Sequence, residues 1–190
     1  MFGESDEAGV GVIVRNSKGE VKAALAEKIR KPPSVEALEL LAARRAAIFS
    51  QELSLDRVIF EGDSEQVMRA LQWGGRHFAS GGHLIRDILC IVNSFVSTSF
   101  SYVCRSGNAV AHAFAQRAGH CFPISIWLES YPADIASFVL ADFQSSIDKN
   151  HRFLSQKKKK KKKKIERKKK RKKLVGFGAH WCWLPSETLR

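Results

Sequence analysis

A short apolar strand that ends in an acidic residue is the feature that most constrains this chain. The run Arg57-Val-Ile-Phe-Glu-Gly-Asp63-Ser64 has the composition of a buried strand, and helical spacing follows it. In α/β proteins, ligands bind just outside the carboxyl ends of the strands, which is where Asp63 falls. Glu39 lies 24 positions earlier, on a strongly patterned helix. One strand could therefore bring the two carboxylates together and begin a metal site.

An antiparallel hairpin is predicted before that helix. Gly9-Val-Gly-Val-Ile-Val-Arg15 is short and β-branched, residues 20–28 form a second extended run, and Asn16-Ser-Lys-Gly19 between them has turn chemistry. Gly19 can adopt the positive φ that such a turn uses. Lys31-Pro-Pro-Ser34 then ends the second strand, and Ser34 can cap a helix that runs to about Glu52.

The next part of the chain alternates helices with a strand. Periodicity and turn residues delimit a helix after Asp63 or Ser64, a loop at 74–82, a helix at 84–95, a strand at 98–104 and a helix at 108–119. Asn108 can cap the last helix and Gly119 can end it. The predicted order is β-β-α-β-α-α-β-α, which indicates an α/β layered domain.

The folded domain is predicted to end near Phe143. Trp127, Tyr131 and Phe138 would be exposed unless their segment packs against the domain, so this segment is interpreted as a packing extension. Beyond it, a block of eight identical lysines repels itself and stays solvated. We therefore expect a domain at 1–143 and a disordered, lysine-rich tail at 144–190.

Net charge describes this tail and not the domain. Lys157 to Lys173 holds fifteen basic residues and one acidic residue, a balance of +14, whereas the whole chain carries +13. The remainder therefore sums to 13 minus 14, or −1. Composition alone gives no evidence for a basic binding face on the domain.

Cysteine spacing and hydropathy suggest an intracellular protein. The four cysteines, at positions 90, 104, 121 and 182, form no C-x-x-C pair, which argues against a zinc ribbon or a redox motif and favours reduced, mostly buried thiols. The acidic N-terminus has no apolar core of a signal peptide, and no stretch approaches the ~18 apolar residues of a membrane span. No membrane partner is expected.

Four segments in a fixed order resemble a known family. They are Gly9-Val-Gly-Val-Ile-Val-Arg-Asn-Ser-Lys-Gly19, Glu39-Leu-Leu-Ala-Ala-Arg-Arg-Ala46, Val58-Ile-Phe-Glu-Gly-Asp-Ser64 and Arg105-Ser-Gly-Asn-Ala-Val-Ala-His-Ala-Phe-Ala115. Together they resemble the type 1 ribonuclease H-like domains, in the reverse-transcriptase-like branch abundant in plant, retroelement-derived proteins. The resemblance extends from Gly9 to about Phe143 and implies a mixed sheet flanked by helices.

The resemblance also implies a site and a reaction. Members of this family hydrolyse the RNA strand of RNA–DNA hybrids with two divalent metal ions, Mg²⁺ among them, which four carboxylates hold. The helix glutamate of the family corresponds to Glu39 and its strand-end aspartate to Asp63. The last aspartate corresponds to His112, a poorer Mg²⁺ ligand than a carboxylate. The histidine that many active members carry near the last strand corresponds at best to Tyr102.

The first aspartate of the family has no counterpart. In the family it ends a strand just before the Gly-Val-Gly-Val segment, whereas this sequence starts only eight residues before Gly9. Our hypothesis is that Met1 is an internal methionine of a longer protein. In this fold the missing strand is the central one of five, so its loss would leave both neighbours without ladder partners and make the domain unstable.

Several residues also have simpler interpretations. Asp63 can be only an N-cap, and Glu36 lies one turn before Glu39 on the same helix face; the Ala-Ala-Arg-Arg-Ala that follows Glu39 favours Glu39. His112 can be a packed residue without a catalytic role. Asn108 can cap its helix or bind substrate, and Arg105 can meet a phosphate or simply lie on the surface.

Two further alternatives stay open. A zinc site from Cys104, His112, His120 and Cys121 fits no common spacing. The lysine run can be a nuclear localisation signal or a non-specific phosphate binder, or it can be an artefact, because a run of adenines reads in frame as polylysine.

The sequence thus predicts a ribonuclease H-type domain that binds nucleic acid. Glu39 and Asp63 are the expected Mg²⁺ ligands, with His112 a third site position and Arg105 and Asn108 expected at the substrate. With two of four carboxylates present, this chain is expected to be inactive. The alternative is a catalytically dead, retroelement-derived domain kept as a nucleic-acid-binding or interaction module.

Overall fold

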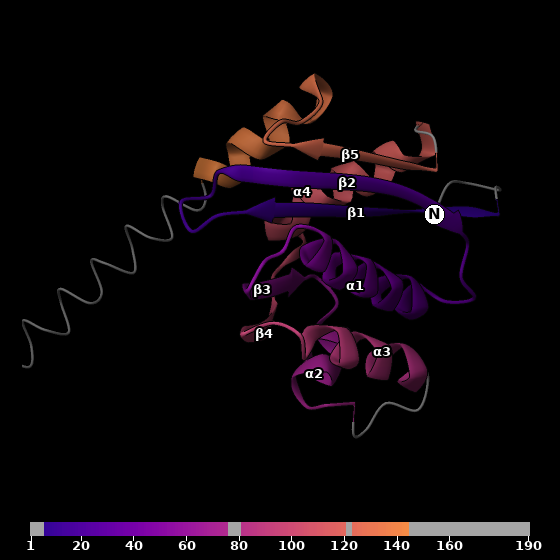
Figure 1. The fold of residues 1–190 in the computed structure, drawn as a ribbon. Coiled ribbons are helices and arrows are strands. Elements are labelled where there is room, and N and C mark those ends of the chain that lie inside the picture. The colour runs from indigo at the N-terminus through magenta and orange to yellow at the C-terminus, as the bar shows by residue number, and fades with distance from the viewer. Residues whose placement is uncertain (1–5, 76–80, 121–122, 145–190) are drawn as a thin grey trace, which may run out of the picture. The chain divides into compact units, whose positions relative to one another are not determined.

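Two separate β-sheets, connected through helices, form the framework of the protein (Figure 1). The computed structural model describes residues 6–75, 81–120 and 123–144. Its strands are β1 (Glu7–Arg15), β2 (Val21–Arg30), β3 (Arg57–Gly62), β4 (Ser97–Tyr102) and β5 (Ile124–Leu128). Its helices are α1 (Val35–Glu52), α2 (Glu65–Gln72), α3 (Gly82–Val92) and α4 (Ala109–Arg117), with 3₁₀ turns η1 (Arg105–Asn108), η2 (Ala118–His120) and η3 (Ala133–Ile135). Residues 136–144 are also helical.

The larger sheet is antiparallel, with the order β1-β2-β5. The predicted hairpin forms its first two strands, and Gly19 has the expected positive φ of 85°. The carbonyl of Asn16 accepts a hydrogen bond from the amide of Gly19 at 2.9 Å, which closes the turn. This part of the sequence-based prediction is confirmed.

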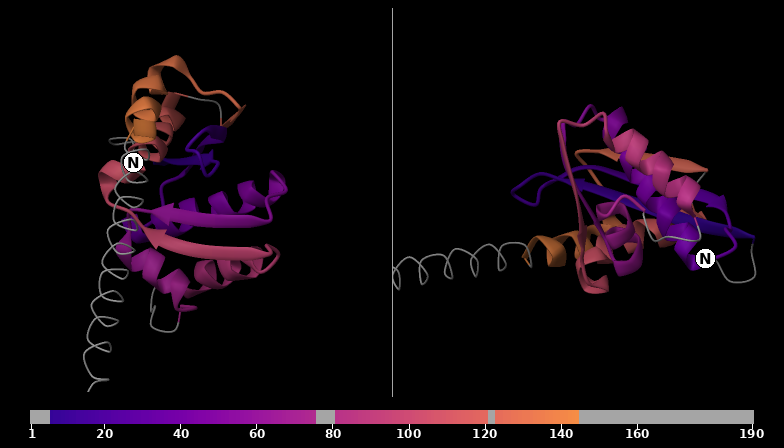
Figure 2. Two further views of the ribbon diagram at one scale, coloured as in Figure 1. Left: turned by 90° about the vertical axis from the view of Figure 1, so that its left-hand side faces the viewer. Right: turned by 90° about the horizontal axis from the view of Figure 1, so that it is seen from below.

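The smaller sheet is a parallel pair. β3 and β4 run side by side in the same direction (Figure 2), from the pair Arg57–Ser97 to the pair Gly62–Tyr102. Among the described strands, β1 pairs with β2 alone and β3 pairs with β4 alone. The predicted mixed α/β fold is therefore confirmed, and its antiparallel and parallel strands belong to two different sheets.

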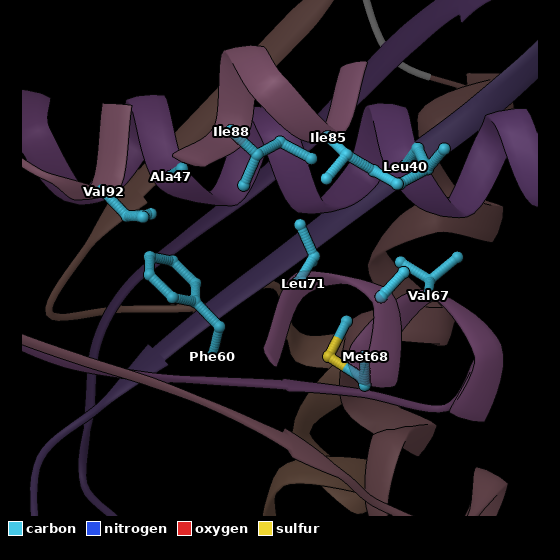
Figure 3. Close-up of a cluster of buried hydrophobic side chains, with 10 residues drawn as sticks. Leu40, Ala47, Phe60, Val67, Met68, Leu71, Ile85, Ile88 and Val92 are labelled. Atoms are coloured by element: carbon cyan, nitrogen blue, oxygen red, sulfur yellow. The ribbon is translucent and has the colours of Figure 1, made fainter. Parts of the chain in front are cut away.

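Helix α1 lies between two hydrophobic cores. On one side, its residues Leu38 and Phe49 pack against apolar side chains of β1 and β2. On the other side, Leu40 and Ala47 face α2, α3 and the parallel sheet, as Figure 3 shows for Phe60 and its neighbours. Ser34 caps the helix as predicted, because its side chain accepts a hydrogen bond from the amide of Ala37.

The opposite face of the antiparallel sheet is covered by α4. Phe114 of this helix is fully buried, and it packs against Trp127 of β5 with ring centroids 5.4 Å apart. Gly11 of β1 permits the close contact, because a Cβ atom at this position would lie 2.1 Å from the carbonyl oxygen of Ala111 and 2.4 Å from the amide nitrogen of Ala115. Helix α4 therefore depends on a glycine at position 11.

Strand β5 was not predicted as a strand. The sequence suggested only a packing extension, and the structure shows that Ile124–Leu128 adds to the edge of β2. Packing of Trp127 is confirmed, whereas Tyr131 and Phe138 stay 36% and 44% exposed, so their predicted burial is wrong. Five residues between turn signals were too few to separate a strand from an irregular segment.

Smaller differences concern the end of α4 and the cysteines. Helix α4 ends at Arg117 and Gly119 lies in the 3₁₀ turn that follows, so the predicted end is two residues late. Cys90 and Cys104 are exposed rather than buried. The lysine-rich segment and Cys121 lie outside the described residues. Within the described residues, every helix is too short or too polar to cross a membrane.

We predict that Gly11→Ala destabilises the domain by about 3 kcal/mol, the upper part of the range for an overpacked site. The new methyl group would meet backbone atoms of α4, which cannot rotate away as a side chain can. Urea denaturation followed by circular dichroism measures the change.

Gly82→Ala is the matched control for this substitution. A Cβ atom at Gly82 meets open space at the start of α3, so this variant should keep or slightly increase the free energy of unfolding. Equal stability of the two variants would show that α4 does not approach β1 as closely as described.

Candidate metal and nucleic-acid site

Asp63 lies at the carboxyl end of β3, directly after Gly62. The N-cap of α2 is the next residue, Ser64, whose side chain accepts a hydrogen bond from the amide of Val67 at 3.4 Å. The interpretation of Asp63 as an N-cap is therefore wrong. Its half-buried carboxylate is available for another role.

Asn108 holds that carboxylate in place. Its Nδ2 donates a hydrogen bond of 2.7 Å to Oδ1 of Asp63, across 45 positions of sequence. Asn108 occupies the N-cap position of α4, but its side chain makes no capping hydrogen bond. The prediction of a side-chain cap is wrong, because the amide reaches the strand end instead.

Glu39 lies on the side of α1 at the boundary between the two cores. Residues 39, 43 and 46 follow helical spacing, and Ala46 packs against both cores, so this stripe runs along the boundary between them. Burial raises the pKa of the Glu39 carboxyl, the negative charge of Asp63 raises it further, and the guanidinium of Arg105 lowers it. The structure thus brings Glu39, Asp63 and Arg105 within electrostatic reach of one another.

Glu36, the alternative on the same helix, lies in the first turn of α1. There its negative charge interacts favourably with the positive end of the helix dipole. Asp63 and Arg105 are the charged groups that act on Glu39, one turn further along. This coupling favours Glu39 as the partner of Asp63.

Arg105 and His112 meet on the exposed side of α4. Nη2 of Arg105 lies 3.5 Å from Nε2 of His112, and Nε2 of Gln116 lies 3.3 Å from the same ring nitrogen. We refer to Arg105, His112 and Gln116 as the Arg105 cluster. Sequence reasoning missed Gln116, although its spacing of four residues from His112 on a helix was a usable signal.

Among the residues that the structure describes, no third metal-binding side chain joins the two carboxylates. Within the described residues, no group of three His, Cys, Asp or Glu side chains is arranged to hold a metal ion. His112 therefore does not join Glu39 and Asp63 in a three-ligand metal site. The same finding gives no support to a zinc site among Cys104, His112 and His120.

Tyr102 ends β4 beside the site. It is paired in register with Gly62, the residue before Asp63, and it is 48% exposed. The structure thus places this side chain at the same sheet edge as the carboxylates. A hollow of about 530 Å³ lies elsewhere, between the ends of α2 and α3 and the start of β4, and none of the candidate residues lines it.

Comparisons with known proteins found a matching family model and similar solved structures. A family model described as reverse transcriptase-like matches residues 2–118. The structure resembles the crystal structure of RNase H1 from Halobacterium salinarum with a TM-score of 0.57 and 22% identity, over 63% of this chain and 91% of that one. It is also similar to the N-terminal RNase H domain of Rv2228c from Mycobacterium tuberculosis, with a TM-score of 0.45 and 14% identity, over 59% and 90%. No curated protein matches the chain significantly.

We predict that Glu39→Gln stabilises the domain at neutral pH. The folded state raises the pKa of Glu39 above its ordinary value of 4.5, so the stability linked to its protonation is present below that value and is lost as pH rises through the raised pKa. Glutamine mimics the protonated form, so its advantage should appear near neutral pH and vanish in acid. Urea denaturation at neutral and acidic pH measures the difference.

Glu36→Gln is the control on the same helix. It removes a charge that favours the helix dipole, so it should not increase stability at neutral pH. A gain from Glu36→Gln, or a gain from Glu39→Gln that persists in acid, would contradict the electrostatic account of Glu39.

Proposed function

Because the chain belongs to the reverse transcriptase-like family and has a ribonuclease H fold, we propose that it binds RNA–DNA hybrids as a ribonuclease H-type domain. We place this domain at residues 1–143, followed by a lysine-rich tail at 144–190. The family match supports nucleic acid as the partner, and the site geometry supports the hybrid backbone as the group recognised. The fold alone would not distinguish a domain that binds RNA–DNA hybrids from a domain of the same fold with another function.

The observation that carries the proposal is the electrostatic coupling between Asp63, which follows β3, and Glu39, on α1. Two carboxylates repel one another, and Asp63 contributes to the raised pKa of Glu39. Asn108 fixes Asp63 with a hydrogen bond rather than with a positive charge. Neither Glu39 nor Asp63 forms an ion pair with a basic side chain among the described residues. Two neighbouring carboxylates without such a partner suit a cation.

The two carboxylates fit one divalent cation better than two. Mg²⁺ prefers oxygen ligands and keeps several of its waters, so Glu39 and Asp63 could hold one ion with water in the remaining positions. Two adjacent ions would need more negative charge than this pair supplies. When bound, such an ion would polarise a phosphate oxygen of the substrate. We expect weak binding, with a dissociation constant on the order of 1 mM.

We propose that hydrolysis is lost in this chain. The family position of a third carboxylate is occupied by His112, whose ring nitrogen faces two side chains that bear N–H groups. A further carboxylate would come from a strand between β1 and β3, and each of these strands has one described partner. We propose that this position belongs to the central strand of the family fold.

The second candidate is a catalytically dead, retroelement-derived domain kept as a nucleic-acid-binding or interaction module. The absence of a three-ligand metal group among the described residues favours it. The two candidates differ in what a complete set of strands would restore. Only the first expects Mg²⁺-dependent cleavage once a strand that carries a further carboxylate is added between β1 and β3.

We predict that the full chain binds an RNA–DNA hybrid and cleaves it no faster than its Asp63→Asn variant. Loss of the Asp63 charge should weaken Mg²⁺ binding at least about tenfold, because a single charged ligand remains. Fluorescence anisotropy measures hybrid binding, gel electrophoresis of the labelled RNA strand measures cleavage, and calorimetry measures Mg²⁺ affinity.

Each outcome of this experiment separates two interpretations. Cleavage by the full chain that Asp63→Asn abolishes would show an active enzyme and overturn the proposed inactivity. Failure of the full chain to bind the hybrid would overturn the proposed function. Asp87→Asn, an exposed surface acid of α3 that pairs with Arg44, is the control for the loss of one negative charge.

The tail gives a separate prediction about salt dependence. If its fifteen basic residues bind phosphates, deletion of residues 157–190 should flatten the salt dependence of hybrid binding, and the slope should fall by about 0.9 for each phosphate that the shortened chain no longer binds. Binding isotherms at several salt concentrations measure this slope. Unchanged affinity, slope and cellular localisation would remove the functional interpretation of the lysine run.

A further inference from the structure

The Arg105 cluster has an organisation of its own. Arg105 and Gln116 both approach Nε2 of His112, at 3.5 Å and 3.3 Å. Arginine is always a donor, and the amide nitrogen of Gln116 is one too, so Nε2 acts as the shared acceptor when the proton of the neutral ring is on Nδ1. In that tautomer, Nε2 of His112 orients the donor groups of both Arg105 and Gln116.

Arg105 differs from most arginines of the domain in its charge partners. Arg15, Arg45, Arg69 and Arg117 each form an ion pair with a carboxylate. For Arg105, no ion pair occurs in the part of the chain that the structure describes. A guanidinium has five N–H donors in a planar fork, and the contact with His112 uses only one edge of it. Arg105 is exposed and has donors left for an anion.

The Arg105 cluster is fixed beside the carboxylates by the chain itself. Asn108, three residues after Arg105, donates its hydrogen bond to Asp63 at 2.7 Å. The 3₁₀ turn η1 spans both residues and leads directly into α4. The effect of Arg105 on the pKa of Glu39 agrees with this proximity. A positive and a negative region thus lie next to each other at the end of β3.

A metal ion is the wrong ligand for the Arg105 cluster. His112 takes part in no three-ligand group within the described residues, and its Nε2 is surrounded by donors that would repel a cation. The guanidinium fork matches the paired oxygens of a phosphate, and Gln116 adds an amide donor on the same face. The chemistry of the cluster is that of an anion site.

We propose that the Arg105 cluster binds a backbone phosphate of the nucleic-acid strand adjacent to the Glu39–Asp63 pair. Arg105 and Gln116 donate to the phosphate oxygens, and His112 positions both donors. This inference rests on the proposed function, because the strand must also approach the carboxylates. It gives His112 a positioning role in place of a metal ligand.

The test compares Arg105→Gln with Arg57→Gln in the full chain. Arg57 is also exposed and forms no ion pair among the described residues, but it begins β3 at the end opposite Asp63. Hybrid binding is measured by anisotropy over a range of salt concentrations. Arg105→Gln should reduce the salt slope by about 0.9, the value for one phosphate contact, and Arg57→Gln should leave the slope unchanged. The tail contributes equally to all three proteins and cancels from the comparison.

The outcomes distinguish this inference from the proposed function. If Arg105→Gln keeps the full slope while hybrid binding persists, the phosphate site is wrong and the proposed function stands. If the unmodified chain binds no hybrid, both are wrong. Circular dichroism of each variant confirms that the fold is retained.

A second measurement tests which source of phosphate the cluster recognises. Imidazole signals of His112, assigned with His112→Gln, should shift when the hybrid is added, and this shift should be lost in Arg105→Gln. Inorganic phosphate at matched ionic strength should leave the signals in place. An equal shift with inorganic phosphate would show a general phosphate site and overturn the assignment to the nucleic-acid backbone.

Discussion

Packing of both cores against helix α1 is the constraint on which the rest of the structure depends. The two described sheets share no strand pairing, so their relative placement comes from side chains rather than from a hydrogen-bond ladder. Leu38 and Leu40, on opposite sides of α1, belong to different cores. One ion pair adds to this link, because Arg15 at the end of β1 lies 3.1 Å from Glu61 of β3. Such a partly exposed pair contributes little compared with two buried cores.

The same arrangement explains why the acidic pair exists. Glu39 lies on the stripe of α1 between the two cores, and Asp63 ends the strand that packs against one of them. Burial raises the pKa of Glu39 and the negative charge of Asp63 raises it further, so the fold holds this carboxylate at an electrostatic cost. Arg105 offsets part of this cost through its positive charge. Carboxylates whose pKa is raised by burial and a neighbouring charge are common at functional sites.

Local features were predictable from the sequence and long-range pairings were not. The turn at Asn16–Gly19 and the cap at Ser34 depend on neighbouring residues, and both follow from residue chemistry. Asp63 was recognisable from its place after an apolar strand. The hydrogen bond from Asn108 to Asp63 was not, because a capping role explained the same residue locally. Strand β5 was also missed, since its partner β2 lies about a hundred positions away.

The Gly11 contact shows how the backbone connects the fold to the site. Helix α4 packs against β1 through main-chain atoms, which leaves it little freedom to slide or rotate. Asn108 directly precedes the first residue of α4 and His112 lies on its exposed face, so the position of the helix sets the positions of both side chains. A shift of α4 would therefore alter the support of Asp63 and the Arg105 cluster together. The support of Asp63 and the Arg105 cluster therefore both depend on the close packing of α4 that Gly11 permits.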